Sequence, residues 1–525
     1  METARGVELT PAPTLVATPI TEKENSITTT TEPGVTALAN ASPLRKYALL
    51  AVFCLGQFLD TMNTAAMFPA IPGISHDVGM TESDSVWLFA AYQATFASFL
   101  LISGRISDVY SPKPVFILGT AFFGIISLGG GFTKDVIPLM VLRALQGIGA
   151  SFTIPSSLNL IVQLFPDPQE QGRAIGLFGA MGATGNVLGT IVGAILVEYT
   201  SWRWIFWLIA IIAVPISILC TILIPQTPRN EQNKKSTFDF VGVFLLTVAV
   251  ILFVYALTTG SVQGWRVAGV LVPLFVSVAL TVAFFLWEAR VGEDSAALPP
   301  KLWFYKNFAI LFAVALMPYF WWYQVYLTFS AYWQDHLHWP SIIAGVKFLP
   351  LGIVAGPIMV NAGHIARIGQ PKWMILGGLT VAFIATLLLP FSDRLHDRYW
   401  PLDFPAFLIG IAGTSVVFVL TNINIFRTTP SRYAGTVGAV FNAALQLGSA
   451  VGTSATTSIQ ASVDSQNIGK EGLTGFEGRS AALWFLLAWI GLEIIGVAVF
   501  FQRSAKSPLD EEAAEGKAGP QAVVH

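Results

Sequence analysis

Gly104-Arg-Ile-Ser-Asp108-Val-Tyr-Ser-Pro112-Lys113 returns 259 residues later as Gly363-His-Ile-Ala-Arg367-Ile-Gly-Gln-Pro371-Lys372. The same offset relates two further stretches, in which a basic residue and four glycines recur. Arg173, Gly176, Gly179, Gly189 and Gly193 correspond to Arg432, Gly435, Gly438, Gly448 and Gly452. A single shift that aligns Gly, Pro and basic residues in separate regions indicates a duplication. The chain therefore contains two related halves.

The composition is that of a membrane protein. Of 525 residues, 54% are hydrophobic and 11% are charged, whereas a soluble domain carries about 25% charged residues. So few charges cannot cover the surface of a water-soluble protein of this size. The net charge of −2 gives no reason to expect a nucleic-acid partner. Two cysteines in separate apolar runs predict no disulfide framework, and no metal-ligand spacing or cofactor motif is present.

Apolar runs long enough to cross a bilayer recur along the chain. A spanning helix needs about 20 mostly apolar residues. Fourteen runs meet this length, at 47–72, 84–104, 114–132, 136–164, 172–197, 203–224, 239–259, 267–288, 307–333, 341–362, 373–391, 403–426, 433–458 and 481–502. We predict an all-α integral membrane protein with 14 transmembrane helices, arranged as two six-helix parallel-repeat bundles plus an inserted helix pair.

The duplication also divides the chain. We expect one bundle over 45–226, a region of linkers with the two inserted helices over 227–302, and the second bundle over 303–503. The tails, 1–44 and 504–525, are rich in small and polar residues that bury too little apolar area to offset chain entropy, so they are expected to be disordered.

The distribution of Lys and Arg predicts the orientation. With the N-terminus inside, the inner segments near the helices hold seventeen basic residues and the outer loops hold seven. Both termini are therefore expected to be cytoplasmic, and an even number of helices agrees with this.

At this point the chain resembles the major facilitator superfamily, and within it the fourteen-helix drug:proton antiporter branch. The resemblance covers about residues 45–503. The loop Gly104–Lys113 is similar to the family's hallmark between helices two and three. Leu142-Arg143-Ala-Leu-Gln146-Gly147-Ile-Gly149-Ala is similar to its helix-four motif, and Gly176–Gly193 to its antiporter motif. Leu59-Asp60-Thr61-Met-Asn63 and Trp202-Arg203-Trp204-Ile205-Phe206 are typical of the fourteen-helix branch. Within that branch, Asp60–Pro72 and Leu101-Ile-Ser-Gly104-Arg105 look most like fungal aminotriazole-resistance and low-affinity ammonium transporters.

One departure concerns the antiporter motif, where Asn186 and Thr190 stand at positions at which the family has prolines. The glycines Gly182, Gly185, Gly189 and Gly193 remain, so close packing of helix five is expected. Whether antiport is strict stays open.

The resemblance implies a proton-coupling site at Asp60, Arg143 and Gln146. A charge at bilayer depth is costly and faces a cavity or a partner, so Asp60 is read either as a proton-binding carboxylate or as a structural acid. Arg143 cannot discharge and is read as the organiser of a buried network or as a structural residue. Glu493 is a second, weaker candidate acid, and Lys347 is expected to reach the outer interface.

Further residues are assigned to a substrate cavity and to a latch between the two halves. Polar and aromatic side chains suit an amphipathic substrate or a cation, and those expected in the substrate cavity are Asn63, Tyr319, Trp322, Tyr323, Tyr326, Asn422, Asn442 and Gln446. In the family, the repeated loop latches the two halves on the inner face, which assigns a latch to Gly104, Asp108, Lys113, Gly363, Arg367 and Lys372.

The chemistry leaves two functions open. No phosphate-binding Gly-rich loop of the ATPase type is present, and no enzyme motif is apparent, so a gradient must drive transport. The first reading is proton-coupled efflux of small organic molecules such as drugs, toxins or secondary metabolites. The alternative is movement of a small inorganic or weak-acid/base solute such as ammonium or borate. Protons, a small-molecule substrate and the lipid bilayer are the expected partners of a monomer in the plasma membrane.

The orientation is tested with short epitope tags placed at residue 5 or at residue 520. Both tags should resist protease in intact cells and become accessible after permeabilisation, because both tails are expected in the cytoplasm. Digestion of either tag in intact cells would contradict the prediction.

Overall fold

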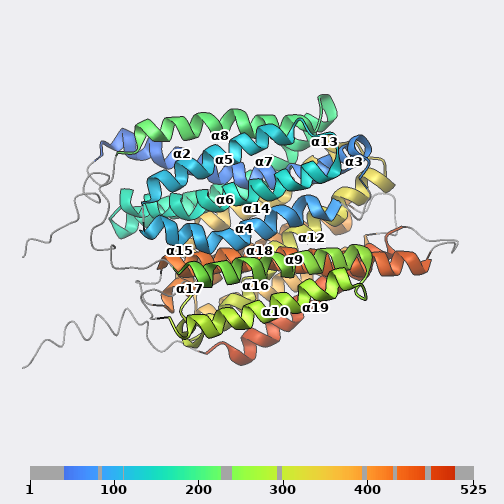
Figure 1. Cartoon of the computed structure of the whole chain (residues 1–525). Coiled ribbons are helices and arrows are strands. Elements are labelled where there is room, and N and C mark those ends of the chain that lie inside the picture. Colours follow the sequence, from blue (N-terminus) through green and yellow to red (C-terminus); the bar gives the residue numbers. More distant parts are fainter. Residues whose placement is uncertain are drawn as a thin grey trace, which may run out of the picture.

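The chain folds into a bundle of long helices, seen in a computed structural model that describes residues 41–80, 85–109, 111–225, 239–291, 298–392, 399–429, 434–467 and 475–502. The helices run side by side along one axis (Figure 1). We call the end at which α2 (Pro43–Ala65) begins and α19 (Glu477–Phe500) ends the terminal face. The opposite end, where α3 (Met67–Val78) and α13 (Ser341–Lys347) meet, is the far face.

The first half contains six membrane crossings. The first crossing is α2 continued by α3. The others are α4 (Ser85–Val109), α5 (Pro112–Gly130), α6 (Val136–Leu164), α7 (Pro168–Tyr199) and α8 (Arg203–Leu223).

An inserted pair and a second set of six crossings follow. The pair is α9 (Phe240–Gln263) and α10 (Ala268–Glu288), after which comes the short helix η2 (Pro300–Phe304). The crossings are then α11 (Phe308–Val314) with α12 (Met317–Ala331) and the π-helical turn η3 (Tyr332–His336); α13 with α14 (Leu349–Val360) and α15 (Ala362–Ile368); α16 (Pro371–Thr386) with η4 (Leu389–Phe391); η5 (Tyr399–Asp403) with α17 (Phe404–Arg427); α18 (Ala434–Asn467); and α19.

Length and apolarity agree with the predicted membrane fold. In the described residues, 13 helices are long and apolar enough to cross a membrane. The remaining predicted crossing is α18, whose buried face carries polar side chains such as Gln446, Ser449 and Thr456 and is therefore less apolar. The helix continues to Asn467, nine residues beyond the end expected at 458.

Prolines interrupt several crossings that the sequence pattern predicts as single helices. Helix α2 ends at Ala65, α11 at Val314 and α16 at Thr386. Each end lies four residues before a proline, at Pro69, Pro318 and Pro390 respectively. A proline ring clashes with the carbonyl four residues earlier and offers no N–H to it, which explains the breaks. Hydrophobic periodicity does not record this effect.

The packing pattern of the first half recurs in the second. Helix α2 packs on α7 as α12 packs on α18, and α5 packs on α6 and α8 as α16 packs on α17 and α19. Between the halves, α4 packs on α18 and α14 on α7, which are again equivalent pairs. The duplication in the sequence is thus a duplication in three dimensions, in which the two copies run parallel.

Glycines allow the closest of these approaches. A Cβ atom added at Gly189 would lie 2.7 Å from the Met62 Cα and 2.9 Å from its carbonyl oxygen. At the equivalent Gly448, an added Cβ would overlap the backbone of Leu316. Gly182, Gly185 and Gly193 likewise face α2, as small residues do where membrane helices approach closely.

Each of the two repeated lysines hydrogen-bonds to carbonyl groups at the C-terminal end of a helix in its own half. Lys113 Nζ donates to the carbonyls of Thr221 (3.3 Å) and Ile224 (2.5 Å) at the end of α8. Lys372 Nζ donates to those of Ala498 (2.7 Å) and Phe501 (2.9 Å) at the end of α19. An ammonium group at a helix C-terminus satisfies unpaired carbonyls and complements the helix dipole.

The inserted pair lies against the seam between the halves. Helix α9 packs on both α4 and α18, and α10 packs on the outside of α9 (Figure 1). Thr247 Oγ1 donates to the Ser98 carbonyl of α4 at 3.3 Å. Nearer the far face, the hydroxyls of Thr258 and Ser454 of α18 lie 3.4 Å apart and share a hydrogen bond. Helix α9 is therefore bonded to both halves.

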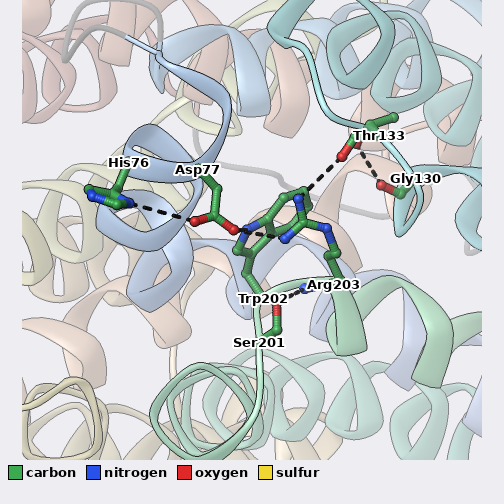
Figure 2. A network of polar contacts seen from close by, with 7 residues as sticks. All are labelled: His76, Asp77, Gly130, Thr133, Ser201, Trp202 and Arg203. Carbon is green, nitrogen blue, oxygen red and sulfur yellow. Dashed lines mark hydrogen bonds and ion pairs between the residues drawn. The ribbon is translucent and has the colours of Figure 1, made fainter.

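A polar cluster fixes the first crossing at the far face (Figure 2). Arg203 Nη1 and Trp202 Nε1 both donate to Asp77 Oδ2, at 2.7 and 3.0 Å. The guanidinium lies over the Trp202 ring, 4.4 Å from its centroid, and Nη2 donates to the Thr133 carbonyl at 3.5 Å. These contacts tie the end of α3 to the start of α8 and to the turn after α5.

Alanine substitutions along α7 test the glycine packing. Gly189→Ala should destabilise the protein by about 1–3 kcal/mol, because the added methyl group meets backbone atoms that cannot move aside. Gly179 has no atom within 4 Å of an added Cβ, so Gly179→Ala should be neutral or stabilising by up to about 1 kcal/mol. Thermal unfolding of the purified variants measures both, and equal unfolding temperatures would contradict the packing argument.

The Asp77 cluster predicts a pH-dependent contribution to stability. The hydrogen bonds from Arg203 and Trp202 hold the pKa of Asp77, which lies beyond the candidate span, below its ordinary value. A lowered pKa in the folded protein gives stability that is present above the ordinary value of about 3.9 and is lost as the pH falls through the folded value.

Asp77→Asn should therefore unfold at a lower temperature than the wild type near neutral pH, and the difference should shrink below about pH 4. His76→Ala should have a smaller effect than Asp77→Asn, because the His76 side chain is 91% exposed and contacts Asp77 only through Nδ1, 3.6 Å from Oδ1. A difference that does not depend on pH would assign the effect to packing instead.

Candidate functional site

A small cavity lies between the two halves near mid-bundle. Its walls come from α2 and α3, from α4 and α7, and from α12 and α18 of the second half. The lining residues are Asp60, Thr61, Thr64, Ala65, Phe68, Tyr92, Asn186, Tyr319, Tyr323, Tyr326 and Gln446. One carboxylate, several tyrosine hydroxyls and two amides thus face a common space inside an apolar bundle.

Asp60 is the acidic residue of this cavity. It lies in α2 six residues before the break at Ala66, and only 6% of the residue is exposed. The Tyr92 hydroxyl of α4 donates a hydrogen bond to Asp60 Oδ1. Within the described part of the chain, no ion pair joins Asp60 to a basic residue. The carboxylate is therefore held by a neutral donor at a depth where charge is costly.

Arg143 organises a buried network next to this pair. Its Nε donates to the Leu88 carbonyl of α4 at 2.9 Å, and Nη1 donates to Gln146 Oε1 at 3.1 Å. Gln146 Nε2 in turn donates to Ser127 Oγ of α5 at 2.7 Å. The guanidinium lies 4.7 Å from the centroid of the Tyr92 ring, a cation–π contact. Arg143 thus reaches Asp60 through Tyr92 and connects three helices.

Aromatic rings close the cavity toward the far face. Phe68 of α3 stacks on Phe89 at a centroid distance of 4.5 Å and on Tyr326 of the second half at 5.2 Å. Ser330 Oγ donates to the Phe68 carbonyl at 3.1 Å, which adds a polar bond across the halves. In this conformation the cavity is sealed on that side by contacts between α3 and α12.

The two departures from the antiporter motif have distinct surroundings. Asn186 lies on the cavity wall, and its Oδ1 is buried without a hydrogen-bond partner in the described residues. Thr190 Oγ1 donates to the Asn186 carbonyl at 3.0 Å, within α7. The substitution of an expected proline by Asn186 therefore places an amide beside Asp60, besides any effect on helix bending.

Other residues predicted for the cavity lie elsewhere. Asn63 is fully buried in α2 but is not part of the cavity wall. Trp322 stacks on Tyr319 at 5.5 Å and lies behind it. Asn422 is on α17 away from the wall, and Asn442 Nδ2 donates to the Gly438 carbonyl of its own helix at 2.9 Å. Tyr319, Tyr323, Tyr326 and Gln446 do face the space.

The residues of the predicted latch lie at the terminal face. An added Cβ at Gly104 would lie 3.8 Å from Ala439 of α18, so α4 and α18 are close there. Arg367 is exposed on α15, and Gly363 has open space around it. The side chain of Asp108 lies outside the described residues. Lys113 and Lys372 bond within their own halves, as described above.

Glu493 and Lys347, the other two charged residues considered in the sequence analysis, do not line the cavity. Glu493 Oε1 accepts a hydrogen bond from Trp489 Nε1 one turn earlier in α19, at 2.8 Å. Lys347 Nζ lies between the rings of Trp339 and Tyr399, 4.3 and 3.9 Å from their centroids. In the part of the chain that the structure describes, no cluster of three metal-ligating residues occurs.

Tyr92, Thr64 and Phe68 belong to the site but were not singled out from the sequence, and Asn186 was noted there only as a departure from the antiporter motif. A signal exists for two of them, because Thr64 and Phe68 follow Asp60 at intervals of four residues and so share its face. No local pattern marks Tyr92, because its role depends on which helix faces α2.

Comparison with known proteins gives the family. A sequence model of the Major Facilitator Superfamily matches residues 53–453. The puromycin resistance protein pur8 of Streptomyces alboniger is 31% identical over 78% of this chain and 80% of its own length. The multidrug transporter mfsC of Aspergillus fumigatus is 27% identical over 89% of both chains, and the low affinity ammonium transporter of Saccharomyces cerevisiae is 23% identical over 87% of this chain and 88% of its own. The human organic anion transporter MFSD10 has a similar fold, with a TM-score of 0.59 at 16% identity, covering 87% of this chain and 100% of that chain.

Proposed function

This chain belongs to the Major Facilitator Superfamily and is a multi-pass membrane transporter, and we propose that it exports small organic molecules in exchange for protons. Alternating access of the two halves would expose the cavity first to one side of the membrane and then to the other. One relative is named for resistance to puromycin and another as a multidrug transporter, which favours export over import.

One observation carries this proposal: a single buried carboxylate lines the same cavity as tyrosine rings from both halves. Tyr319, Tyr323 and Tyr326 present apolar faces and polar hydroxyls, which suit an amphipathic organic molecule. A cationic group of the substrate would lie near Asp60, where the opposite charge offsets the cost of burying the carboxylate. The substrate class is thus an amphipathic organic cation or a neutral molecule with a hydrogen-bond donor.

Competition at Asp60 explains how a proton gradient would drive export. In this space Asp60 is stable either as a charged carboxylate paired with a cationic substrate or as a neutral carboxyl group with a bound proton. The cation and the proton exclude one another. Substrate binding therefore favours proton release, and proton binding favours substrate release. No second acid is needed for coupling, because the proton and the cationic substrate would both bind the carboxylate oxygens of Asp60.

A second function is supported by the similarity to the low affinity ammonium transporter of yeast. The small size of the cavity in this conformation and the amides of Asn186 and Gln446 suit a small polar solute. Under this reading, ammonium or another small weak base takes the place of the organic cation at Asp60. The same carboxylate serves both functions, so the size of the accepted solute distinguishes them.

For the orientation, we propose that the terminal face is cytoplasmic and that the protein acts as a monomer in the plasma membrane. The excess of Lys and Arg on that side supports this arrangement. Lys113 and Lys372, which bond to helix ends at that face, belong to this excess.

Replacement of Asp60 by Asn tests the function. Asp60→Asn preserves the side-chain size but fixes the neutral state, so export of ethidium or puromycin from cells should fall at least about tenfold and should lose its sensitivity to a protonophore. Exchange of labelled substrate across the membrane should persist, because it needs no net proton movement. Methylammonium, measured in parallel, tests the second function.

Glu198→Gln is the matched control, since Glu198 is an exposed acid at the far end of α7. This variant should export like the wild type. Protonophore-sensitive export by Asp60→Asn at the wild-type rate would refute coupling at Asp60. Transport of methylammonium alone would select the second function.

A further inference from the structure

Tyr92 occupies the point at which the cavity meets the arginine network. Its hydroxyl donates to Asp60 Oδ1, and the face of its ring lies 4.7 Å below the Arg143 guanidinium. Only 1% of Tyr92 is exposed, and Arg143 is fully buried. Since Asp60 and Arg143 form no ion pair in the described structure, Tyr92 is the physical connection between the two charges.

We propose that Tyr92 is the positioning residue that couples the protonation of Asp60 to the Arg143 network. This rests on the proposed proton-coupled export. When Asp60 is charged, the Tyr92 hydroxyl donates to it. When a carboxylate oxygen binds a proton, a new O–H bond forms at Asp60 and becomes a donor, while the phenol keeps its own proton. A proton on Oδ1 makes that oxygen a donor, so the phenol must accept the hydrogen bond or turn its own O–H elsewhere. A proton on Oδ2 leaves Oδ1 as an acceptor, but a weaker one. The hydrogen bond from Tyr92 to Asp60 is thus either reversed or weakened when Asp60 is protonated.

The surroundings confine this change to the Tyr92 side chain. An added Cβ at Gly147 would overlap the Tyr92 carbonyl, so the backbones of α4 and α6 touch at this level. Thr95 Oγ1 donates to the Ala144 carbonyl at 2.7 Å and fixes the same contact. Because the helices cannot separate here without losing both contacts, the Tyr92 ring is the part that can respond to Asp60.

The response would reach α5 through the network. The Tyr92 ring supports the Arg143 guanidinium, whose Nη2 is buried without a hydrogen-bond partner in the described residues. If the Tyr92 ring moves, the Arg143 guanidinium moves with it, and its hydrogen bond to Gln146 is strengthened or weakened. Gln146 in turn donates to Ser127 of α5, so the change reaches that helix. The proton on Asp60 is thereby sensed by α4, α5 and α6.

Other groups near Asp60 are accounted for. Tyr319, Tyr323 and Tyr326 of α12 line the same cavity with their phenol groups, and Asn186 of α7 and Gln446 of α18 contribute amides. Arg143 of α6 is the charged group on that side. Among the described residues, Tyr92 contacts both Asp60 and Arg143, the first through its hydroxyl and the second through its ring.

The experiment compares the pH profiles of ethidium transport in proteoliposomes for the wild type, Tyr92→Phe and Tyr92→Leu. Tyr92→Phe keeps the ring but removes a donor to the charged carboxylate, so the protonated form is favoured and the profile should move by about one unit toward alkaline pH. Tyr92→Leu also removes the ring beneath Arg143 and should in addition lose most transport. Tyr255→Phe on α9 is the control and should follow the wild type.

A double variant separates coupling from structural damage. In the Asp60→Asn background, Tyr92→Phe should change the profile no further, because the charged acceptor is already gone. If Tyr92→Phe folds and its pH profile of transport coincides with that of a pH-dependent wild type, the proposed role of Tyr92 is refuted, but the proposed proton coupling is not. A wild-type profile without pH dependence would overturn the proposed proton coupling, and the role of Tyr92 with it.

A second measurement requires no change at Tyr92 and covers the case in which its variants do not fold. Infrared difference spectra between acidic and alkaline pH should contain a tyrosine C–O band in the wild type that is absent from Asp60→Asn. An identical tyrosine band in both proteins would contradict the coupling.

Discussion

A carboxylate at bilayer depth must be stabilised by the protein, and much of the central architecture serves this requirement. Within the described structure no ion pair joins Asp60 to a basic residue, and the Tyr92 hydroxyl donates a hydrogen bond to it. Tyr92 is in turn fixed by Arg143 and by the tight contact of α4 with α6 at Gly147. The charge of Asp60 is therefore tolerated but not neutralised, which leaves it able to bind a proton or a cation.

The duplicated fold gives this site its mobility. Glycines hold α2 against α7 and α12 against α18, so each half is internally close-packed. Across the halves, contacts near the far face include stacked aromatic rings and the hydrogen bond from Ser330 to Phe68. A sealed cavity whose seal consists of stacked rings is compatible with a rearrangement in which each half moves as a unit, since ring contacts exchange at little cost compared with buried polar networks.

Much of the fold could be read from the sequence, but the centre of the site could not. The 259-residue repeat and the apolar runs predict two parallel halves and an inserted pair, because hydrophobic length and duplication are properties of the chain itself. The breaks before Pro69 and Pro318 escaped the pattern, since apolarity continues through them. Asp60 stands out as an isolated charge, whereas Tyr92 looks like any aromatic residue of an apolar helix until α4 is placed against α2. Asn186 shows the same limit: its departure from the motif was visible, but not its position on the cavity wall.

The central claim is that a proton and a substrate compete for Asp60, and proton release on substrate binding tests it most directly. Purified protein in a weakly buffered solution with a pH-sensitive dye is mixed with ethidium near the midpoint of its pH profile. The account predicts release of up to about one proton for each substrate bound by the wild type, and none by Asp60→Asn. Substrate binding without proton release by the wild type, or equal release by both proteins, would contradict it.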